Sequence, residues 1–350
     1  MSCGAVCESD FMKMVKKILL ASPRGFCAGV ARAIKAVEDT IEIFGASASP
    51  NQSLTEQGNG RVYVKHEIVH NKHVVQALEK QGAITIEKLS DVPDGSVVVF
   101  SAHGSPRAHY AEAKVRGLRL IDATCPLVTK VHLEVLRYLK DGFHIIYIGH
   151  RGHIEGIGVL GEAPDVSIPL VETVEDVVRL DIGSPEKLVY LTQTTLSLDD
   201  TAAVIDALKQ KYPQIVAPPL EDICYATTNR QEAVKALAQV CDLVLIVGSQ
   251  TSSNSTRLME TARATGRKAY LIDDIWGLKN EWFDNVAVVG ISAGASAPEH
   301  LVQDIVSHLS SGGATVEDFI VKQETMKFSE PLELMKIRAE RQIAQEGVVQ

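Results

Sequence analysis

The sequence predicts an α/β protein made of three pseudo-equivalent βαβ-type domains, each with a small parallel sheet. Three observations predict it: apolar runs alternate with helix-period segments, a cysteine recurs at strand-to-helix junctions, and two other loop types recur in step with it. The polar loops at the carboxyl ends of parallel strands share one edge of their sheet. We therefore expect the domains to form a cloverleaf whose polar loops converge on a central cavity.

The cysteine junction occurs three times at nearly equal intervals. Cys27 follows a strand pattern at residues 17–22 and precedes a helix pattern at residues 30–44. Cys125 stands in the same situation 98 residues later, and Cys224 a further 99 residues on. Even spacing at one type of junction indicates a repeated unit rather than three unrelated cysteines.

Two further loop types support the repeat. Gly149 and Gly248 follow apolar runs and are 99 residues apart, and the loops at Ser101, Thr192 and Ser292 are spaced by 91 and 100 residues. The expected organisation is an N-terminal tail, three α/β repeats and a C-terminal tail, at residues 1–15, 16–115, 116–212, 213–312 and 313–350.

Two segments fall outside the repeat. Residues 46–60 are polar and rich in Gly, Ser and Asn, which predicts a surface insertion in the first repeat. The tail from residue 313 has no strand pattern, and we expect it to cross back over another domain or to fray.

Composition and charge exclude several classes of function. A content of 45% hydrophobic and 23% charged residues is ordinary for a globular protein with a real core. The net charge of -9, with no long Lys/Arg run, disfavours nucleic acid and anionic membranes as partners. No apolar stretch is typical of a secretion signal or a membrane span, so a cytoplasmic location is expected.

Three cysteines that converge on one cavity allow several uses. A disulfide would leave one thiol over, and structural zinc normally takes four ligands, often in CxxC pairs that this chain lacks. Zinc with three cysteines remains an alternative. A [4Fe–4S] cluster on Cys27, Cys125 and Cys224, with one open iron site, is favoured. Cys241 is predicted to be a buried core residue, and Cys3 and Cys7 are assigned no role.

The remaining polar loops indicate an anionic substrate. Their imidazole, hydroxyl and amide donors, placed at helix starts, suit a phosphate or diphosphate. The candidates are His70, His103, His153, Thr194, Ser252, Ser253, Asn254 and Ser296. Glu155 is a candidate proton donor whose pKa burial would shift. Each candidate also has an alternative without a catalytic or binding role. The histidines would be ordinary surface or core residues, the Ser and Thr side chains would cap helices, and Glu155 would stabilise the first turn of a helix through the helix dipole.

Nine stretches of the chain together resemble the 4-hydroxy-3-methylbut-2-enyl diphosphate reductase family of the methylerythritol phosphate route to isoprenoids. They run in the family's order from Ile18 to Val302 and read PRGFCAGV, HEIVHN, SAHG, DATCPLVTKVH, GHRGHIEG, TQTTLS, DICYATTNRQEAV, VGSQTSSNS and AGASAP. One departure is Ile154, where the family often has proline.

The resemblance implies a cloverleaf α/β fold with a central [4Fe–4S] cluster on Cys27, Cys125 and Cys224. It implies that the substrate's hydroxyl binds the open iron while side chains hold its diphosphate. The positions that match the family's substrate contacts are His70, His103, His153, Thr194, Thr227, Ser252, Ser253, Asn254 and Ser296.

The activity implied is reductive dehydroxylation of the substrate to isopentenyl and dimethylallyl diphosphate. The expected catalytic residues are Glu155, which would protonate the leaving oxygen through Thr194 or water, and His153. A ferredoxin or flavodoxin is the expected electron donor, and a monomer or weak homodimer the expected state. The rival functions are a zinc hydrolase or lyase acting on a phosphorylated metabolite, and a non-enzymatic iron–sulfur sensor.

Overall fold

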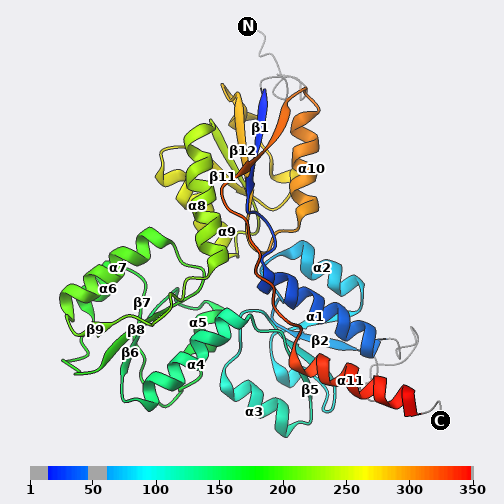
Figure 1. Cartoon of the computed structure of the whole chain (residues 1–350), viewed down its shortest axis with the longest axis vertical. Coiled ribbons are helices and arrows are strands. Elements are labelled where there is room, and N and C mark those ends of the chain that lie inside the picture. The colour runs from blue at the N-terminus through cyan, green and yellow to red at the C-terminus, as the bar shows by residue number, and fades with distance from the viewer. Residues whose placement is uncertain (1–14, 46–60, 348–350) are drawn as a thin grey trace. The chain divides into compact units, whose positions relative to one another are not determined.

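Three small parallel sheets and the helices between them make up the fold of this computed structural model (Figure 1). The structure describes residues 15–45 and 61–347, so Cys3, Cys7 and the predicted insertion at 46–60 lie outside the described residues. The chain divides into two compact units, of which one holds residues 1–27, 195–201 and 223–326, and the other holds residues 28–194, 202–222 and 327–350. We call them unit 1 and unit 2. The predicted α/β class with three parallel sheets is confirmed.

Unit 1 contains a five-stranded sheet in the order β11-β10-β12-β1-β13, with every neighbouring pair parallel. Its strands are β1 (Lys17–Ser22), β10 (Leu243–Val247), β11 (Lys268–Ile272), β12 (Val288–Ala293) and β13 (Thr315–Ile320). Its helices are α8 (Tyr225–Val240), α9 (Ser253–Ala264) and α10 (Glu299–Ser310), with 3-10 turns at Ile275–Gly277 and Asn280–Phe283.

Both faces of this sheet are buried, which explains the continuous apolar runs of its central strands. On β1, Ile18 and Leu20 face the core that includes α10, whereas Leu19 and Ala21 face the core that includes α8 and α9. A parallel sheet covered by helices on both faces places its polar loops at the carboxyl ends of the strands.

Unit 2 contains two four-stranded parallel sheets. The first has the order β3-β2-β4-β5, with strands β2 (Val62–Lys65), β3 (Ala83–Ile86), β4 (Val97–Phe100) and β5 (Arg119–Asp122). The second has the order β7-β6-β8-β9, with strands β6 (His144–Ile148), β7 (Leu170–Val171), β8 (Leu188–Thr192) and β9 (Ile215–Val216).

Helices connect these strands as the alternating pattern predicts. Those beside the first sheet are α1 (Ala28–Phe44), α2 (Lys72–Lys80), α3 (Arg107–Val115), a 3-10 turn at Leu89–Asp91 and α11 (Leu332–Gly347). Those beside the second are α4 (Pro126–Lys140), α5 (Ile154–Leu160), α6 (Val174–Arg179) and α7 (Leu198–Lys211), of which the first turn of α7 belongs to unit 1.

The strand before each cysteine belongs to a different sheet from the one the repeat boundaries suggest. Strand β1, expected to open the first repeat, pairs with β12 of the third repeat and with β13 of the C-terminal segment. Likewise β5 pairs with β4, and β9 pairs with β8, although both lie beyond the expected boundaries at 116 and 213. The strand before each cysteine is thus part of the sheet from which the chain then departs. The loop that carries the cysteine connects this strand to the first helix of the next sheet.

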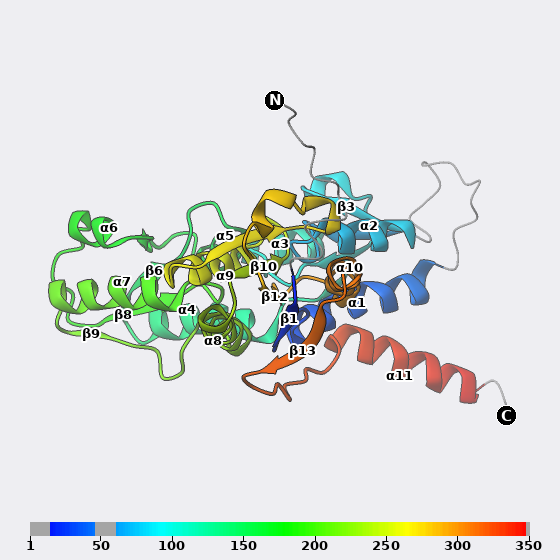
Figure 2. The ribbon, with the colours of Figure 1, turned by 90° about the horizontal axis from the view of Figure 1, so that it is seen from above.

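The C-terminal segment contains regular structure that its composition did not predict. Strand β13 extends the sheet of unit 1 beyond β1, and its side chains are mostly exposed. Helix α11 then crosses back to unit 2 and runs alongside α1 (Figures 1 and 2), where Leu334 is buried in the core and Arg338 pairs with Asp39 at 3.0 Å.

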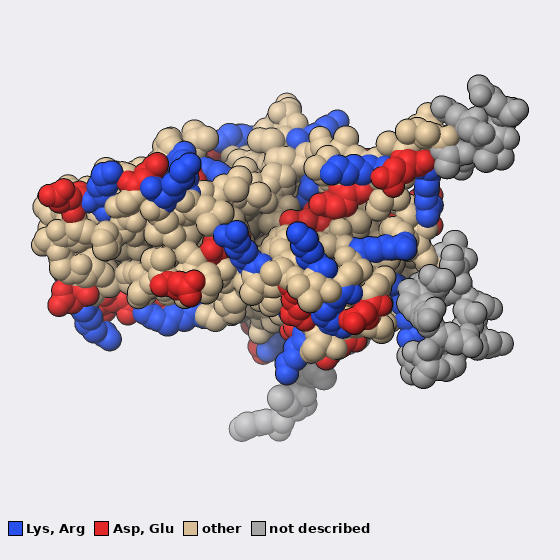
Figure 3. Space-filling view, turned by 90° about the horizontal axis from the view of Figure 1, so that it is seen from below, with Lys and Arg blue, Asp and Glu red and all other residues tan. Residues whose placement is uncertain are grey.

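The distribution of charged side chains on the surface agrees with the absence of a long Lys/Arg run in the sequence. On the face shown in Figure 3, basic and acidic side chains are interspersed rather than gathered into a field of one sign. Within the described part of the chain, the helices are too short or too polar to cross a lipid bilayer.

Candidate active site

Loops at the carboxyl ends of strands in both sheets of unit 2 bring three histidines together. His70 follows β2, His103 follows β4, and His153 follows β6. The ring centroids of His70 and His103 are 4.1 Å apart, and those of His70 and His153 are 5.6 Å apart. The third distance, between His103 and His153, is 6.3 Å. The predicted histidines therefore form one cluster.

The rings of His103 and His153 are neutral at neutral pH. Burial lowers the pKa of His153 to about 4, with smaller contributions from His70 and His150. Burial also lowers the pKa of His103 well below its usual value, and the neighbouring rings add to the effect. A neutral imidazole presents one N–H donor and one acceptor, so each ring can donate a hydrogen bond without carrying charge.

The tautomer of His153 follows from its place at the start of α5. Its Nδ1 accepts a hydrogen bond from the Glu155 backbone N at 3.2 Å, so the ring proton lies on Nε2. That Nε2 is buried and has no hydrogen-bond partner among the described residues. Since buried donors are rarely left unpaired, this atom is suited to a ligand oxygen. The imidazole caps α5, which begins at Ile154 even though no proline stands there.

Glu155 and Thr194 form a buried pair beside this cluster. The Glu155 side chain accepts two hydrogen bonds from Thr194, from its backbone N at 2.7 Å and from its Oγ1 at 3.0 Å. Glu155 is only 2% exposed, and burial raises its pKa to about 7 despite the opposing effect of these bonds. A carboxyl with that pKa carries a proton for much of the time at neutral pH and can donate it.

Tyr147 on β6 is a buried residue near Glu155 that was not predicted. Its ring lies so close to Gly149 that a Cβ there would be 2.6 Å from Tyr147 Cε1. Burial raises the pKa of Tyr147 well above its usual value, and the charge of Glu155 adds to this, so the hydroxyl stays neutral. The equally spaced Gly248 has the side chain of Ser255 over it instead. The repeat indicated equivalent positions for the two glycines, but not the side chains that pack over them.

In unit 1 a chain of hydrogen bonds connects two of the predicted cysteines. The Cys27 backbone N donates to Ala295 O at 3.3 Å, and the Ala295 N donates to Asn254 Oδ1 at 2.9 Å. Asn254 Nδ2 donates to Thr227 Oγ1 at 3.4 Å, and this hydroxyl lies 3.2 Å from Cys224 Sγ. Four of the residues predicted from separate motifs thus lie on one network.

The predicted serines occupy the same part of unit 1. Ser252 is the N-cap of α9, and its side chain accepts from the Ser255 N at 3.4 Å, as the capping alternative requires. Ser253 Oγ donates to the Thr195 carbonyl at 3.2 Å, and Ser296 is buried. Hydroxyl and amide groups at the start of α9 form a polar surface suited to an anion.

A known protein family matches this chain. The family described as LytB protein matches residues 18–310, which is most of the sequence. The chain belongs to the LytB family.

Individual relatives cover nearly the whole chain. A protein of Haemophilus influenzae (strain PittGG), named 4-hydroxy-3-methylbut-2-enyl diphosphate reductase, is 53% identical over 91% of this chain and 98% of its own length. One of the same name from Chromohalobacter salexigens is 51% identical over 94% of this chain and 100% of its own.

Two solved structures are also similar to this chain. The Plasmodium falciparum E-1-hydroxy-2-methyl-but-2-enyl-4-diphosphate reductase has a TM-score of 0.87 at 40% identity, covering 94% of this chain and 99% of that one. A second structure, described as the terminal enzyme of the non-mevalonate pathway, has a TM-score of 0.59 at 30% identity, covering 85% of this chain and all of that one.

The three cysteines are chemically suited to bind the predicted iron–sulfur cluster. None of the three forms a disulfide among the described residues, and each directly precedes a helix, α1, α4 or α8, whose N-terminus favours thiolate. Cys27 and Cys224 belong to unit 1 and Cys125 to unit 2. Within the described residues of either unit, no three His, Cys, Asp or Glu side chains form a metal site. The cluster therefore stays a prediction.

Cys241 differs from these three. Its side chain is 2% exposed, and burial raises its thiol pKa to about 11. It packs in the core between the sheet of unit 1 and α8, as predicted for a buried core residue.

Arg230 is a site residue that the sequence analysis missed. Its fully buried guanidinium donates to the Gly25 carbonyl from Nε at 3.2 Å and from Nη2 at 2.8 Å. It also pairs with Glu324 at 2.9 Å. Arg230 therefore holds the turn that precedes Cys27. The signal was present in the run of six consecutive polar residues, 227–232, because a run longer than one helical turn places at least one polar side chain on the buried face of the helix.

The chain contains one glycine pattern that resembles a dinucleotide-binding fingerprint. Gly156, Gly158 and Gly161 form a GxGxxG sequence that the sequence analysis overlooked. Gly156 and Gly158 lie inside α5, and Gly161 ends it, so the pattern forms no turn between a strand and a helix. The motif lacks the context of a Rossmann phosphate loop and indicates no nicotinamide site.

Proposed function

We propose that this chain catalyses the reaction for which its relatives are named, the reduction of 4-hydroxy-3-methylbut-2-enyl diphosphate. The hydroxyl group would leave as water, and the products would be isopentenyl and dimethylallyl diphosphate. The observation that carries the proposal is the buried Glu155–Thr194 pair, with a carboxyl pKa of about 7, beside the histidine cluster.

The histidine cluster would bind the diphosphate. His153 presents a buried Nε2–H that has no partner among the described residues, and His103 lies in the same cluster. Because burial keeps both rings neutral, an arriving anion meets hydrogen-bond donors without prior ion pairs to break. The polar groups of unit 1, Thr227, Ser252, Ser253, Asn254 and Ser296, are the further proposed substrate contacts.

Glu155 would act as the proton donor through Thr194. When Glu155 is ionised, Thr194 Oγ1–H donates to its Oε2 across 3.0 Å. When the carboxyl is protonated at Oε2, the direction of this bond reverses, and the hydroxyl hydrogen of Thr194 turns toward its other side. Thr194 can therefore pass a proton from Glu155 to a leaving oxygen. His153 would hold the anion close to this relay.

A cofactor must supply the electrons. When bound by Cys27, Cys125 and Cys224, a [4Fe–4S] cluster would supply single electrons and a Lewis-acidic iron with an open position. The overall change consumes two electrons and two protons, breaks the carbon–oxygen bond, forms a carbon–hydrogen bond and releases water. We propose a ferredoxin or flavodoxin of the cytoplasm as the donor.

The test is turnover under anaerobic conditions with dithionite-reduced methyl viologen and the hydroxylated diphosphate. Wild type should form both products, and Glu155→Gln should lose about 10²-fold or more in kcat with intact metal content. Asp39→Asn is the matched control, because Asp39 is a buried carboxylate outside the site. Conversion of the substrate without reductant would instead support the zinc hydrolase or lyase.

A further inference from the structure

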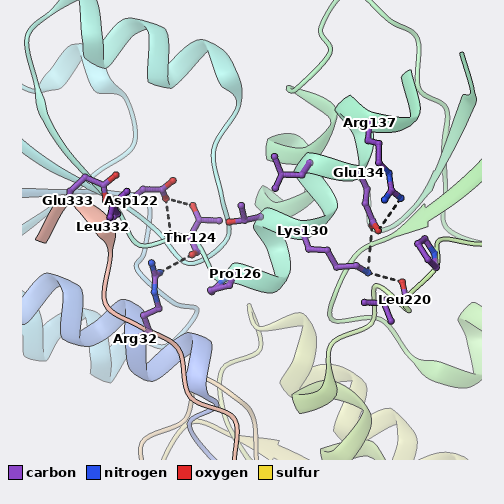
Figure 4. A pocket seen from close by; sticks show the side chains of 13 residues that line it. Arg32, Asp122, Thr124, Pro126, Lys130, Glu134, Arg137, Leu220, Leu332 and Glu333 are labelled. Carbon is purple, nitrogen blue, oxygen red and sulfur yellow. Dashed lines mark hydrogen bonds and ion pairs between the residues drawn. The ribbon is translucent and has the colours of Figure 1, made fainter. Parts of the chain in front are cut away.

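Helix α4 presents two different faces within unit 2. One face lines an open groove of about 680 Å³, where Lys130 and Arg137 pair with Glu134 at 3.6 Å and 3.8 Å (Figure 4). The other face carries His132, about 200° around the helix from Lys130. The groove is therefore electrostatically satisfied by its own side chains, whereas the opposite face buries an imidazole.

The His132 ring lies in a corner between α5 and the loop that follows His103. Its Nδ1 lies 2.7 Å from Oε1 of Glu162, just beyond the end of α5, so Nδ1 carries a proton and donates it to that carboxylate. Its Nε2 is buried, and a Cβ at residue 104 would lie 2.7 Å from it. Gly104 also has a φ of +82°, so both the space and the backbone require glycine there.

Helix α5 meets the same loop with no side chain between the two backbones. A Cβ on Gly158 would lie 3.3 Å from the Gly104 carbonyl carbon and 3.3 Å from His132 Cε1, and a Cβ on Gly161 would lie 2.5 Å from Pro106 Cβ. These distances are shorter than an ordinary van der Waals contact between carbon atoms. The contact formed by Gly104, Pro106, His132, Gly158 and Gly161, which we call the α5 seam, thus has no room for a further methyl group.

The α5 seam accounts for two glycines of the GxGxxG sequence, Gly158 and Gly161. Gly156 lies outside the seam, where a Cβ would be in ordinary contact with Tyr147 Cε1 at 3.4 Å. The Gly161 carbonyl, at the end of α5, accepts a hydrogen bond from the Arg107 N at the start of α3, across 3.3 Å. The two helix ends thus satisfy backbone groups that have no partner within their own helices.

Two of the clustered histidines are each fixed to their own side of the α5 seam. His103 stands one residue before Gly104, and its Nδ1 lies 3.2 Å from Ser101 Oγ in the same loop. His153 caps the start of α5, where its Nδ1 accepts from the Glu155 N. Because each ring is bonded locally, the packing of the loop against the helix sets the 6.3 Å between the two ring centroids.

We propose that Gly158 and Gly161 are positioning residues that set the distance between the His103 and His153 rings to fit a diphosphate. The proposal rests on the proposed function, in which the histidine cluster binds the diphosphate of the substrate. Both glycines act through the loop and the helix that carry the rings. A neutral imidazole donates one directional hydrogen bond, so two rings can serve the same diphosphate only at a suitable relative placement.

The proton relay does not cross the α5 seam. Glu155 lies on α5, which follows β6, and Thr194 follows β8, and these two strands pair with each other in the second sheet of unit 2. The two hydrogen bonds between Glu155 and Thr194 are therefore independent of the loop at Gly104. A change in the seam should weaken binding of the diphosphate and leave the relay intact.

The experiment measures diphosphate binding and turnover in Gly158→Ala and Gly161→Ala. Each variant adds one methyl group to the seam, and the higher helix propensity of alanine offsets part of the strain at residue 158. We expect the Kd of anaerobically purified protein for inorganic diphosphate, measured by titration calorimetry, to rise about tenfold in each. With reduced methyl viologen, the KM for the hydroxylated diphosphate should rise about tenfold while kcat stays within about threefold of wild type.

A double-mutant cycle separates positioning from a general loss of structure. His103→Ala removes one of the two rings and should itself raise the Kd for inorganic diphosphate about tenfold. In that background Gly158→Ala should add less than about threefold, because the ring that the seam positions is gone. The matched control is Gly156→Ala, the same change in the same helix outside the seam, which should keep the wild-type Kd.

A wild-type Kd for inorganic diphosphate in both seam variants would overturn the proposal. Fully additive effects of Gly158→Ala and His103→Ala, or an equal loss in Gly156→Ala, would also overturn it, since the seam would then not act through His103. A fall in kcat at unchanged KM would place the effect on the proton relay and refute the positioning role.

Two outcomes in wild type separate this proposal from the proposed function. Diphosphate binding that follows the cycle, in a protein without viologen-driven turnover, would support the positioning role and refute the proposed function. Absence of diphosphate binding by wild type would overturn the positioning role, because the histidine cluster would then not be the diphosphate site.

Discussion

The pKa of Glu155 makes a prediction about stability that needs no substrate and no cofactor chemistry. Glu155→Gln keeps the shape of the side chain and both hydrogen bonds, because the amide oxygen can accept from the Thr194 N while the amide nitrogen donates to Thr194 Oγ1. The substitution therefore removes only the ionisable carboxyl group of residue 155. Comparison of the two proteins across pH therefore isolates the free energy linked to this proton.

The sign and size follow from the two pKa values. The folded protein holds the Glu155 proton up to about pH 7, whereas the unfolded chain releases it near 4.5. The folded state binds more protons between these values, so the free energy of unfolding falls as pH rises through this window. Each pH unit corresponds to about 1.4 kcal/mol, which gives a loss of about 3 kcal/mol by pH 8.

The assay is urea unfolding of wild type and Glu155→Gln at pH 5, 6, 7 and 8, under otherwise identical conditions. All other groups titrate alike in both proteins and cancel in the difference. The variant should gain about 2.5 kcal/mol relative to wild type between pH 5 and pH 8. A difference that stays constant with pH would show that the Glu155 carboxyl has an ordinary pKa, and it would remove its role as a proton donor at neutral pH.

Three other substitutions test the supporting structure. Arg230→Met leaves the Gly25 carbonyl without its donor and should lower the free energy of unfolding by about 3 kcal/mol or more in urea; an effect below 1 kcal/mol would contradict this. Gly149→Ala forces a methyl group against Tyr147 and should cost about 1–3 kcal/mol, and an unchanged melting temperature would refute the close approach. Cys241→Ser should keep the full iron content, and loss of iron would show that the ligand assignment is wrong.

Local structure was predicted well where one strand or helix carries its own pattern. The strand at residues 17–22 lies where expected, and the helix expected to begin at Val30 begins at Ala28, two residues earlier. The histidines were found because each follows a strand in a repeated loop, His70 and His153 in one loop type and His103 in another. Their ring contacts follow from the parallel topology, which aligns the carboxyl ends of the strands.

Features that depend on pairing between distant segments were not predicted. The position of β1 beside β12 cannot be read from its own sequence, because any apolar strand fits several neighbouring strands. Strand β13 has a mixed polar composition, since it lies at the exposed edge of its sheet. Tyr147 looks like any other strand residue, and only its packing over Gly149 reveals its role at the site.

The central claim is that Cys27, Cys125 and Cys224 hold one iron–sulfur cluster that an incoming substrate can reach. The most direct measurement is iron and acid-labile sulfide per chain in anaerobically purified protein, with the visible spectrum recorded before and after addition of the hydroxylated diphosphate. We expect about four irons and four sulfides per chain and a spectrum that changes on addition. Colourless protein with one zinc per chain, or a cluster whose spectrum ignores the diphosphate, would contradict the account.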